Sequence, residues 1–160
     1  MLIRAYTRYC VAHVFVASET LMSKSILIAD DSTPSRQVVR KVVERAGFAV
    51  CGEAVDGVDA VDKASELKPD LIVLDLRLPR LNGIEAAYIL RGRLPQTPIV
   101  LFTMYDVAAS VVSAAGITSV LHKSDGIAKL AACVQTLLAP KRPLTPSSSE
   151  TSSAFSSGSE

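Results

Sequence analysis

Short apolar runs alternate with helical patterns from Ser25 to Ala139, and this alternation restricts the fold more than any other feature. Residues 70–76 (DLIVLDL) are continuously apolar apart from two aspartates, as in parallel strands buried on both faces. Strands that alternate with helices form open parallel sheets with right-handed crossovers. We therefore predict an α/β fold of the doubly wound, flavodoxin-like type, with five parallel strands in the order 2-1-3-4-5 and helices on both faces. The predicted strands are residues 25–29, 48–54, 70–76, 98–103 and 117–122.

Capping residues and apolar spacing mark the helices between these strands. Thr33 and Pro34 open the first helix, which Gly47 closes. The fourth helix is expected over about residues 106–115. Ser124 is the expected cap of the last helix.

The length of 160 residues suits one domain with a hydrophobic core, which we place at residues 23–140. Residues 1–22 are interpreted as an extension outside the fold, because Met22 begins a segment that looks like a natural protein start. An export or anchoring signal is the alternative for this segment. Residues 141–160 are rich in serine and proline and are predicted to be a disordered tail.

The composition argues against several classes of protein. The net charge is +1 and no basic stripe is present, so direct DNA binding is not expected. The apolar run at residues 9–17 is too short for a membrane span, which needs about 20 residues, so no membrane contact is expected. The cysteines are widely spaced and indicate free thiols in a reducing cytoplasm. They are Cys10, Cys51 and Cys133.

Polar residues stand at the carboxyl ends of four predicted strands. Asp30 and Asp31 follow the first strand, and Asp75 lies at the end of the third. The fourth ends in Thr103, and Lys123 follows the fifth. In a doubly wound sheet all these ends lie along one edge, where ligands bind. If the first and third strands are neighbours, three carboxylates meet there with a hydroxyl and an ammonium.

Three crowded carboxylates require either a raised pKa or a bound cation. Oxygen ligands favour Mg²⁺, Ca²⁺ or Mn²⁺ over zinc, and Mg²⁺ suits carboxylates combined with phosphate oxygens. A carboxylate can also act as a nucleophile and form an acyl phosphate. The sequence therefore predicts a site at Asp30, Asp31 and Asp75 that binds a divalent cation and could receive a phosphoryl group.

The order and spacing of these residues resemble the response-regulator receiver family. The resemblance rests on the aspartate pair after the first strand and on the D-x-x-x-P-x-x-x-G pattern from Asp75 to Gly83. Thr103 and Lys123 at the ends of the last two strands complete it. It extends from about Lys24 to Ala139. The segment GEAVDGVDA is similar to the receiver subgroup usually fused to nitrate-regulator-type DNA-binding domains, so the chain looks like a stand-alone member.

The resemblance implies a phosphoacceptor signalling module of a two-component phosphorelay. It implies that Asp75 accepts the phosphoryl group, that Thr103 hydrogen-bonds it, and that Lys123 pairs with it electrostatically. The family's phosphodonor is a histidine kinase or a phosphotransfer protein. The implied ligands of Mg²⁺, direct or through water, are Asp30, Asp31, Asp75 and the backbone carbonyl of Arg77.

The family's output is a change in the face formed by the fourth helix, fifth strand and fifth helix. Here Val107 to His122 contains no charged residue if the histidine is neutral. We interpret residues 107–138 as a surface for an output protein or for self-association. The alternative is an Ala/Ser-rich helix that packs unusually deeply. Only the tail follows Ala139, so no DNA-reading head is expected in this chain.

Several positions depart from the family pattern. The family's switch aromatic usually lies three residues before the lysine, where this chain has Val120. Ser124 follows the lysine where many relatives have proline, and Met104 replaces a smaller residue that usually follows the threonine. Arg77 and Tyr105 occupy the variable positions beside the acceptor, which influence phosphate lifetime in this family.

Four alternatives to the signalling module differ in the residues that they would need. A non-phosphorylated scaffold with the same fold is favoured if Val120 and Met104 disable the switch. A truncated DNA-binding regulator would explain the subgroup resemblance. A phosphatase or phosphotransferase would need a second carboxylate two residues after Asp75, where Arg77 stands, so a turnover enzyme is not expected. A flavin-binding protein would need an uncharged phosphate loop instead of DDSTPSR.

Overall fold

The computed structural model describes residues 23–139. The extension predicted at residues 1–22 and the tail predicted at 141–160 lie outside the described residues, as does the apolar run at 9–17. Within the part that is described, no helix is both long enough and apolar enough to cross a membrane.

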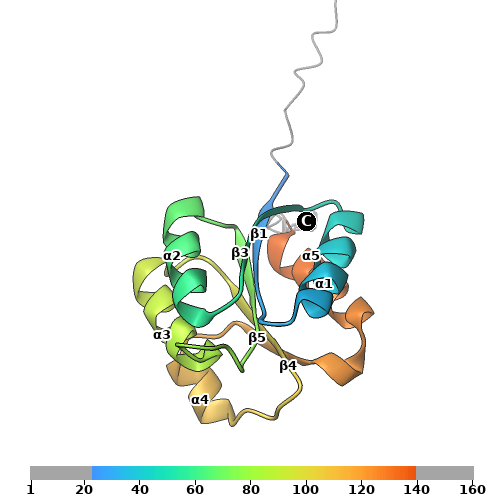
Figure 1. The fold of residues 1–160 in the computed structure, drawn as a ribbon. Helices are drawn as coiled ribbons and strands as arrows, with labels where there is room; N and C mark the ends of the chain where they lie inside the picture. Colours follow the sequence, from blue (N-terminus) through green and yellow to red (C-terminus); the bar gives the residue numbers. More distant parts are fainter. Residues whose placement is uncertain (1–22, 140–160) are drawn as a thin grey trace, which may run out of the picture.

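Five parallel strands form one sheet in the order β2-β1-β3-β4-β5, which confirms the predicted order (Figure 1). All four strand pairs are parallel. The strands β1, β3 and β4 lie inside the sheet, and the residues of β3 and β4 are all buried, as expected for continuous apolar runs. The strands are β1 (Ser25–Ala29), β2 (Ala49–Ala54), β3 (Leu71–Leu74), β4 (Ile99–Thr103) and β5 (Ser119–His122).

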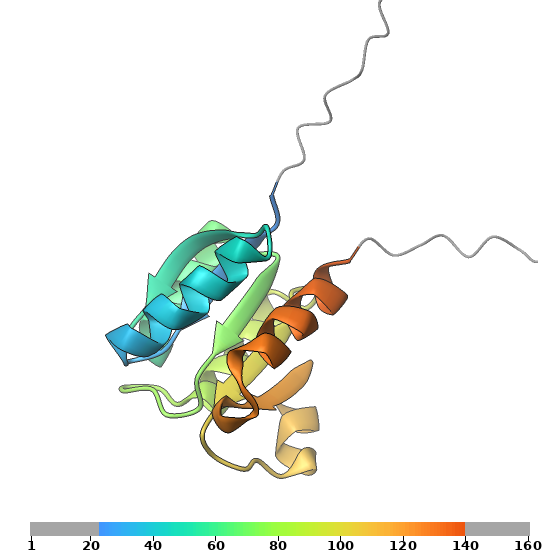
Figure 2. The same cartoon turned by 90° about the vertical axis from the view of Figure 1, so that its right-hand side faces the viewer.

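The helices cover both faces of the sheet. In two perpendicular views α1 and α5 lie together on one face, whereas α2, α3 and α4 lie on the other (Figures 1 and 2). Side-chain oxygens of Ser32, Asp56 and Asn82 cap the first three helices. The helices are α1 (Thr33–Arg45), α2 (Gly57–Leu67), α3 (Gly83–Arg93), α4 (Ala109–Ala114) and α5 (Ile127–Leu138).

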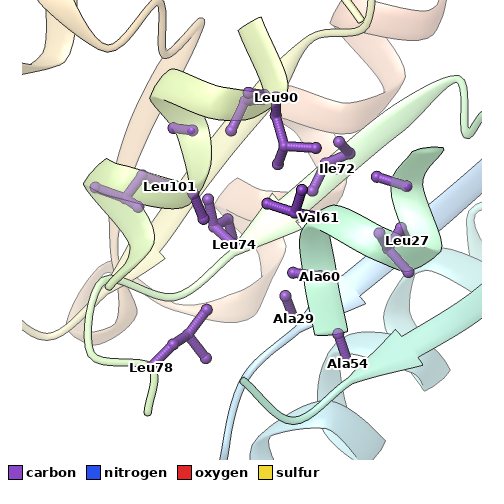
Figure 3. Packing of buried hydrophobic residues seen from close by; sticks show 14 of the residues in the cluster. Leu27, Ala29, Ala54, Ala60, Val61, Ile72, Leu74, Leu78, Leu90 and Leu101 are labelled. Atoms are coloured by element: carbon purple, nitrogen blue, oxygen red, sulfur yellow. The ribbon is translucent and has the colours of Figure 1, made fainter. Parts of the chain in front are cut away.

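Alternate residues of β1, β3 and β4 enter two separate cores. Along β1, Leu27 and Ala29 face α2 and α3, whereas Ile26 and Ile28 face α1 and α5. Figure 3 shows the first of these cores, in which Leu27 and Ala29 lie beneath helix α2. These four residues of β1 are almost fully buried. Burial on both sides holds the strand ends, and therefore the polar residues after them, at defined positions.

Two helix starts differ from the predictions. The helix predicted from about residue 106 begins only at Ala109. No side-chain oxygen caps it at Ala108 and no residue of α4 is buried, so neither capping nor packing extends the helix towards residue 106. Ser124 does not cap the last helix. It lies in the 3₁₀ turn Lys123–Asp125, and α5 starts after Gly126 at Ile127.

The loop after β3 is attached to the N-terminal end of α2. The N–H of Gly57 donates to the carbonyl of Pro79 at 3.2 Å, and Arg80 Nη1 donates to Asp56 Oδ2 at 3.1 Å. A Cβ atom at Gly57 would lie 1.9 Å from the carbonyl oxygen of Leu81. Asp56 and Gly57 belong to the segment at residues 52–60 that suggested the family subgroup. Part of this segment therefore holds the loop after β3 in place.

Gly83 begins α3 directly against the backbone of Asp75. A Cβ atom at Gly83 would lie 2.2 Å from the Asp75 carbonyl oxygen, and the Gly83 N–H donates to the carbonyl of Leu76 at 2.8 Å. Only a residue without a side chain allows this approach. The spacing from Asp75 to Gly83 thus reflects how closely the helix and the strand end are packed.

Gly83→Ala is expected to destabilise the fold by about 1–3 kcal/mol, because its methyl group meets backbone that cannot move without disturbing Asp75. Urea unfolding measures the change. Gly92→Ala is the matched control, since Gly92 lies in the same helix with no atom within 4 Å of the added Cβ. The control should be neutral or stabilising by up to about 1 kcal/mol. Equal effects at both glycines would contradict this account of Gly83.

Candidate functional site

The ends of the neighbouring strands β1 and β3 bring three carboxylates together. The Asp75 N–H donates to the Ala29 carbonyl at 2.8 Å, and the Asp30 N–H donates to the Ala54 carbonyl at 3.2 Å. These bonds extend the sheet ladder to the aspartates. One oxygen each from Asp30, Asp31 and Asp75 lies within 4.8 Å of the others. The predicted meeting of the three carboxylates is therefore present in the structure.

The three carboxylates differ in their surroundings. Asp30 is 3% exposed and Asp75 is 8% exposed, whereas Asp31 is open to solvent. Asp30 Oδ1 accepts from the Ser32 N–H at 2.8 Å, and its Oδ2 accepts from the Ser35 hydroxyl at 2.5 Å. Asp75 Oδ1 accepts from the Leu76 N–H at 2.6 Å. Two carboxylates are thus held in fixed positions and the third faces water.

Lys123 supplies the positive charge nearest to these carboxylates among the described residues. Its Nζ donates to Asp30 Oδ2 and to Asp75 Oδ2, at 2.7 Å in both cases. Burial by itself would lower the pKa of the Lys123 ammonium, but the hydrogen bonds to the two carboxylates outweigh burial and raise this pKa. The ammonium therefore stays charged and bridges the ends of β1 and β3.

Thr103 ends β4 and is completely buried. Its Oγ1 accepts a hydrogen bond from the Tyr105 N–H at 3.3 Å, so the hydroxyl hydrogen remains for another acceptor. In the sheet register Thr103 pairs with His122, the residue before Lys123. The threonine and the lysine thus belong to adjacent strand ends on the carboxyl edge of the sheet.

Arg77 and Tyr105 connect the loops that follow β3 and β4. Arg77 Nη1 donates to the Tyr105 hydroxyl at 3.0 Å, and the guanidinium carbon lies 5.2 Å from the centre of the ring. Both side chains are exposed. A hollow of about 630 Å³ adjoins Arg77 and the exposed Asp31. The acidic site is therefore reachable from solvent on this side.

The two departures next to Thr103 and Lys123 contact each other through His122. The His122 Nε2 lies 2.7 Å from the Met104 carbonyl oxygen, so this nitrogen carries the hydrogen, and Nδ1 lies 2.5 Å from Ser124 Oγ. The Met104 side chain is 56% exposed, and Val120 is 36% exposed. His122 is half-buried on the edge strand β5, and its link between the two loops depends on the pairing of β4 with β5.

Arg36 is a further residue of the site region that sequence reasoning did not find. It is 8% exposed, and its Nη1 donates to the Asp30 carbonyl oxygen at 2.7 Å. Its Nε donates to Glu53 Oε2 at 3.0 Å and its Nη2 donates to Thr33 Oγ1 at 3.1 Å. Hydrogen bonds from Arg40 and then Arg36 outweigh burial and lower the pKa of Glu53. An arginine in the first turns of a helix is ordinarily solvated, so the sequence carries no signal of this burial.

The chemistry of the site suits a hard divalent cation. All three clustered donors are carboxylates, and one of them faces solvent, which leaves room for water on the cation. Mg²⁺ prefers oxygen ligands and commonly keeps several waters when one or two carboxylates bind it. No histidine or cysteine belongs to this cluster of described residues, so the donor set does not resemble a zinc site.

Comparison with known proteins agrees with this geometry. Residues 26–135 match the family described as "Response regulator receiver domain". The chemotaxis protein CheY of Thermotoga maritima is 36% identical over 93 residues, which is 58% of this chain and 78% of CheY. A protein-glutamate methylesterase/protein-glutamine glutaminase of the same organism is 37% identical over 87 residues, 54% of this chain but only 25% of that protein.

A solved structure shows the same fold. The two-component response regulator of the LuxR family from Aurantimonas sp. SI85-9A1 superposes with a TM-score of 0.68 and 34% sequence identity, covering 73% of this chain and 86% of that one. The family match spans more than half of the chain and includes every strand end that carries an acidic or basic site residue. This chain belongs to the response regulator receiver domain family.

Proposed function

We propose that Asp75 accepts a phosphoryl group from a histidine kinase or a phosphotransfer protein, and that the modified domain changes a protein-contact surface. The observation that carries this proposal is the cluster of Asp30, Asp31 and Asp75 with Lys123 bridging two of its members. A cluster of this kind combines a nucleophilic carboxylate with positive charge for the incoming phosphoryl oxygens.

In the proposed step a carboxylate oxygen of Asp75 forms a bond to phosphorus while the bond from phosphorus to the donor's imidazole nitrogen breaks. The electron pair of the broken bond stays on the imidazole. The product is an acyl phosphate on Asp75. Because Asp75 is held by the Leu76 N–H and by Lys123, its carboxylate is already oriented at the edge of the sheet.

Lys123 and Thr103 act on the phosphoryl oxygens in this proposal. The Lys123 ammonium already contacts Asp75 Oδ2, so it lies beside the position where negative charge arrives. Thr103 Oγ1 accepts a hydrogen bond from the Tyr105 N–H, which does not use the hydroxyl hydrogen. This hydrogen is therefore available to donate to a phosphoryl oxygen.

Asp30, Asp31 and Asp75 would hold Mg²⁺, together with the backbone carbonyl of Arg77. When bound, the ion supplies positive charge for the phosphoryl oxygens. The exposure of Asp31 and the hollow beside Arg77 support entry of the ion and of a phosphodonor from this side.

For the output we propose the surface of residues 107–138, which includes α4, β5 and α5. No residue of α4 is buried, and Val111 and Val120 are 40% and 36% exposed. This exposure argues against an unusually deep packing of the Ala/Ser-rich helix. Uncharged apolar side chains on an accessible surface suit contact with an output protein or with a second copy of the chain.

A non-phosphorylated scaffold is the second candidate. It is favoured by Val120 at the place of the family's switch aromatic, because an isopropyl group cannot report phosphorylation by rotating a ring. The similarity to a two-component response regulator of the LuxR family supports the subgroup that the segment at residues 52–60 suggested. For this chain we propose a stand-alone role without DNA or membrane contact, in the cytoplasm.

We further propose that the chain is not a turnover enzyme on a free substrate. The residue two positions after Asp75 is Arg77, which cannot act as the acid or base that aspartyl-nucleophile phosphatases place there. Its guanidinium contacts Tyr105 at the rim of the site. The methylesterase relative matches this chain over only 25% of its length, and its activity is not assigned to this chain.

Intact mass spectrometry after incubation with acetyl phosphate and Mg²⁺ tests the acceptor. The wild type should gain one phosphoryl group, and Asp75→Asn should gain none because an amide is not a nucleophile for phosphorus. Asp62→Asn, at an exposed aspartate of α2, should behave as the wild type. Unchanged mass of the folded wild type with both acetyl phosphate and a phosphorylated histidine donor would favour the scaffold.

Lys123→Met should lower the stability of the metal-free protein by about 2–4 kcal/mol, because it leaves two largely buried carboxylates without their cation. Mg²⁺ should recover most of this loss if it binds among the carboxylates. Urea unfolding in EDTA and in Mg²⁺ measures both effects. Lys129→Met, which removes an exposed lysine of α5, is the control and should change little. If Mg²⁺ does not reduce this loss of stability, the ion does not bind among these carboxylates.

Phosphorylation should shift the backbone amide resonances of residues 107–138 in addition to those at the acidic site. The comparison is wild type against Asp75→Asn, each with acetyl phosphate and Mg²⁺. The mutant controls for binding of the additives alone. Shifts confined to the loops after β1 and β3 would show that the signal does not reach the proposed output surface, and would favour a scaffold.

A further inference from the structure

We propose that Arg36 is a positioning residue for the acidic site, which holds the backbone of Asp30 so that the carboxylates of Asp30 and Asp31 are presented to a divalent cation. This inference rests on the proposed function in that it concerns the same cation site. Arg36 itself belongs to α1 and contacts the site only through the backbone of Asp30.

The guanidinium of Arg36 joins three parts of the chain. Through three nitrogens it reaches the carbonyl of Asp30 at the end of β1, the carboxylate of Glu53 in β2 and the hydroxyl of Thr33 at the start of α1. The planar fork of arginine makes these bonds from three separate nitrogens, whereas the three N–H groups of a lysine ammonium all lie on one nitrogen. The turn from β1 into α1 is therefore fixed from inside the protein.

The position of this turn decides where the acidic side chains lie. Asp30 is held by its carbonyl at Arg36 and by its carboxylate at Ser32 and Lys123. The exposed Asp31 follows it directly, so its orientation depends on the same segment. Some residues do not bind a metal themselves but hold its ligands in place by hydrogen bonds. Replacing such a residue typically lowers the metal affinity by about 10–100-fold.

If only charge mattered, the loss of Arg36 would strengthen the binding of Mg²⁺ and not weaken it. Removing a cation near an acidic site lowers repulsion and strengthens the binding of another cation. Glu53 offsets part of the Arg36 charge, since their side chains lie 3.0 Å apart. A substitution that keeps the charge but breaks the fork therefore separates positioning from electrostatics.

The test is Arg36→Lys, with Arg40→Lys as the matched control. Arg40 lies one turn further along α1 and donates to the same Glu53 at 2.7 Å, and its Nη1 donates to Glu44 at 3.0 Å. Mg²⁺ is titrated while the amide resonances of the wild type and both variants are followed. We expect Arg36→Lys to weaken Mg²⁺ affinity about tenfold, and Arg40→Lys to remain within about twofold of wild type.

Hydrogen exchange of the metal-free proteins gives a second readout. The Ser32 N–H donates to Asp30 Oδ1, so it should exchange faster in Arg36→Lys than in Arg40→Lys if the turn is loosened. Wild-type affinity and exchange in a folded Arg36→Lys protein would overturn the inference while leaving the proposed function intact. If the wild type itself binds no Mg²⁺, the proposed cation site fails, and this inference fails with it.

Discussion

The site depends on the electrostatic balance between three clustered carboxylates and the ammonium of Lys123. Two of the carboxylates are largely buried, and burial of like charges would be costly if no cation were near. Lys123 reaches both of them from the turn after β5, at 2.7 Å in each case. The first, third and fifth strands are therefore linked by charge at the edge where the proposed phosphoryl transfer occurs.

The rest of the fold keeps these groups at fixed positions. The strands β1 and β3 are neighbours with apolar residues on both faces, so neither strand end can shift without disturbing a core. Gly83 lets α3 begin against the backbone of Asp75. Gly57 lets the loop between β3 and α3 pack against the start of α2. A change at either glycine would reach the carboxylates through backbone, although neither glycine carries a functional group.

The surroundings of the site also show how this chain differs from a general description of its family. Arg77 and Tyr105 form a polar and stacking contact across two loops, and His122 connects the residue after Thr103 with the turn that carries Lys123. Val120 occupies β5 without an aromatic ring. These side chains lie on the strands and loops next to the acidic cluster, so the positions that depart from the family pattern belong to its surroundings and not to the cluster itself.

Local patterns were enough to predict the order of the elements, the parallel sheet and the residues at the strand ends, because apolar runs and helical spacing can be recognised along the chain. The sequence also shows the pattern from Asp75 to Gly83 and the position of Lys123 after the fifth predicted strand. The start of α4 and the capping of α5 were predicted wrongly, since helix ends depend on single capping contacts.

The fold was needed to establish which carboxylates are buried, which oxygens Lys123 contacts, and that Arg36 lies beneath the site. The physical reason is that these properties depend on distances between residues far apart in the chain. Arg36 is buried because α1 packs against β2, where Glu53 supplies its counter-charge. An arginine with a buried partner and an arginine in solvent look the same in a sequence.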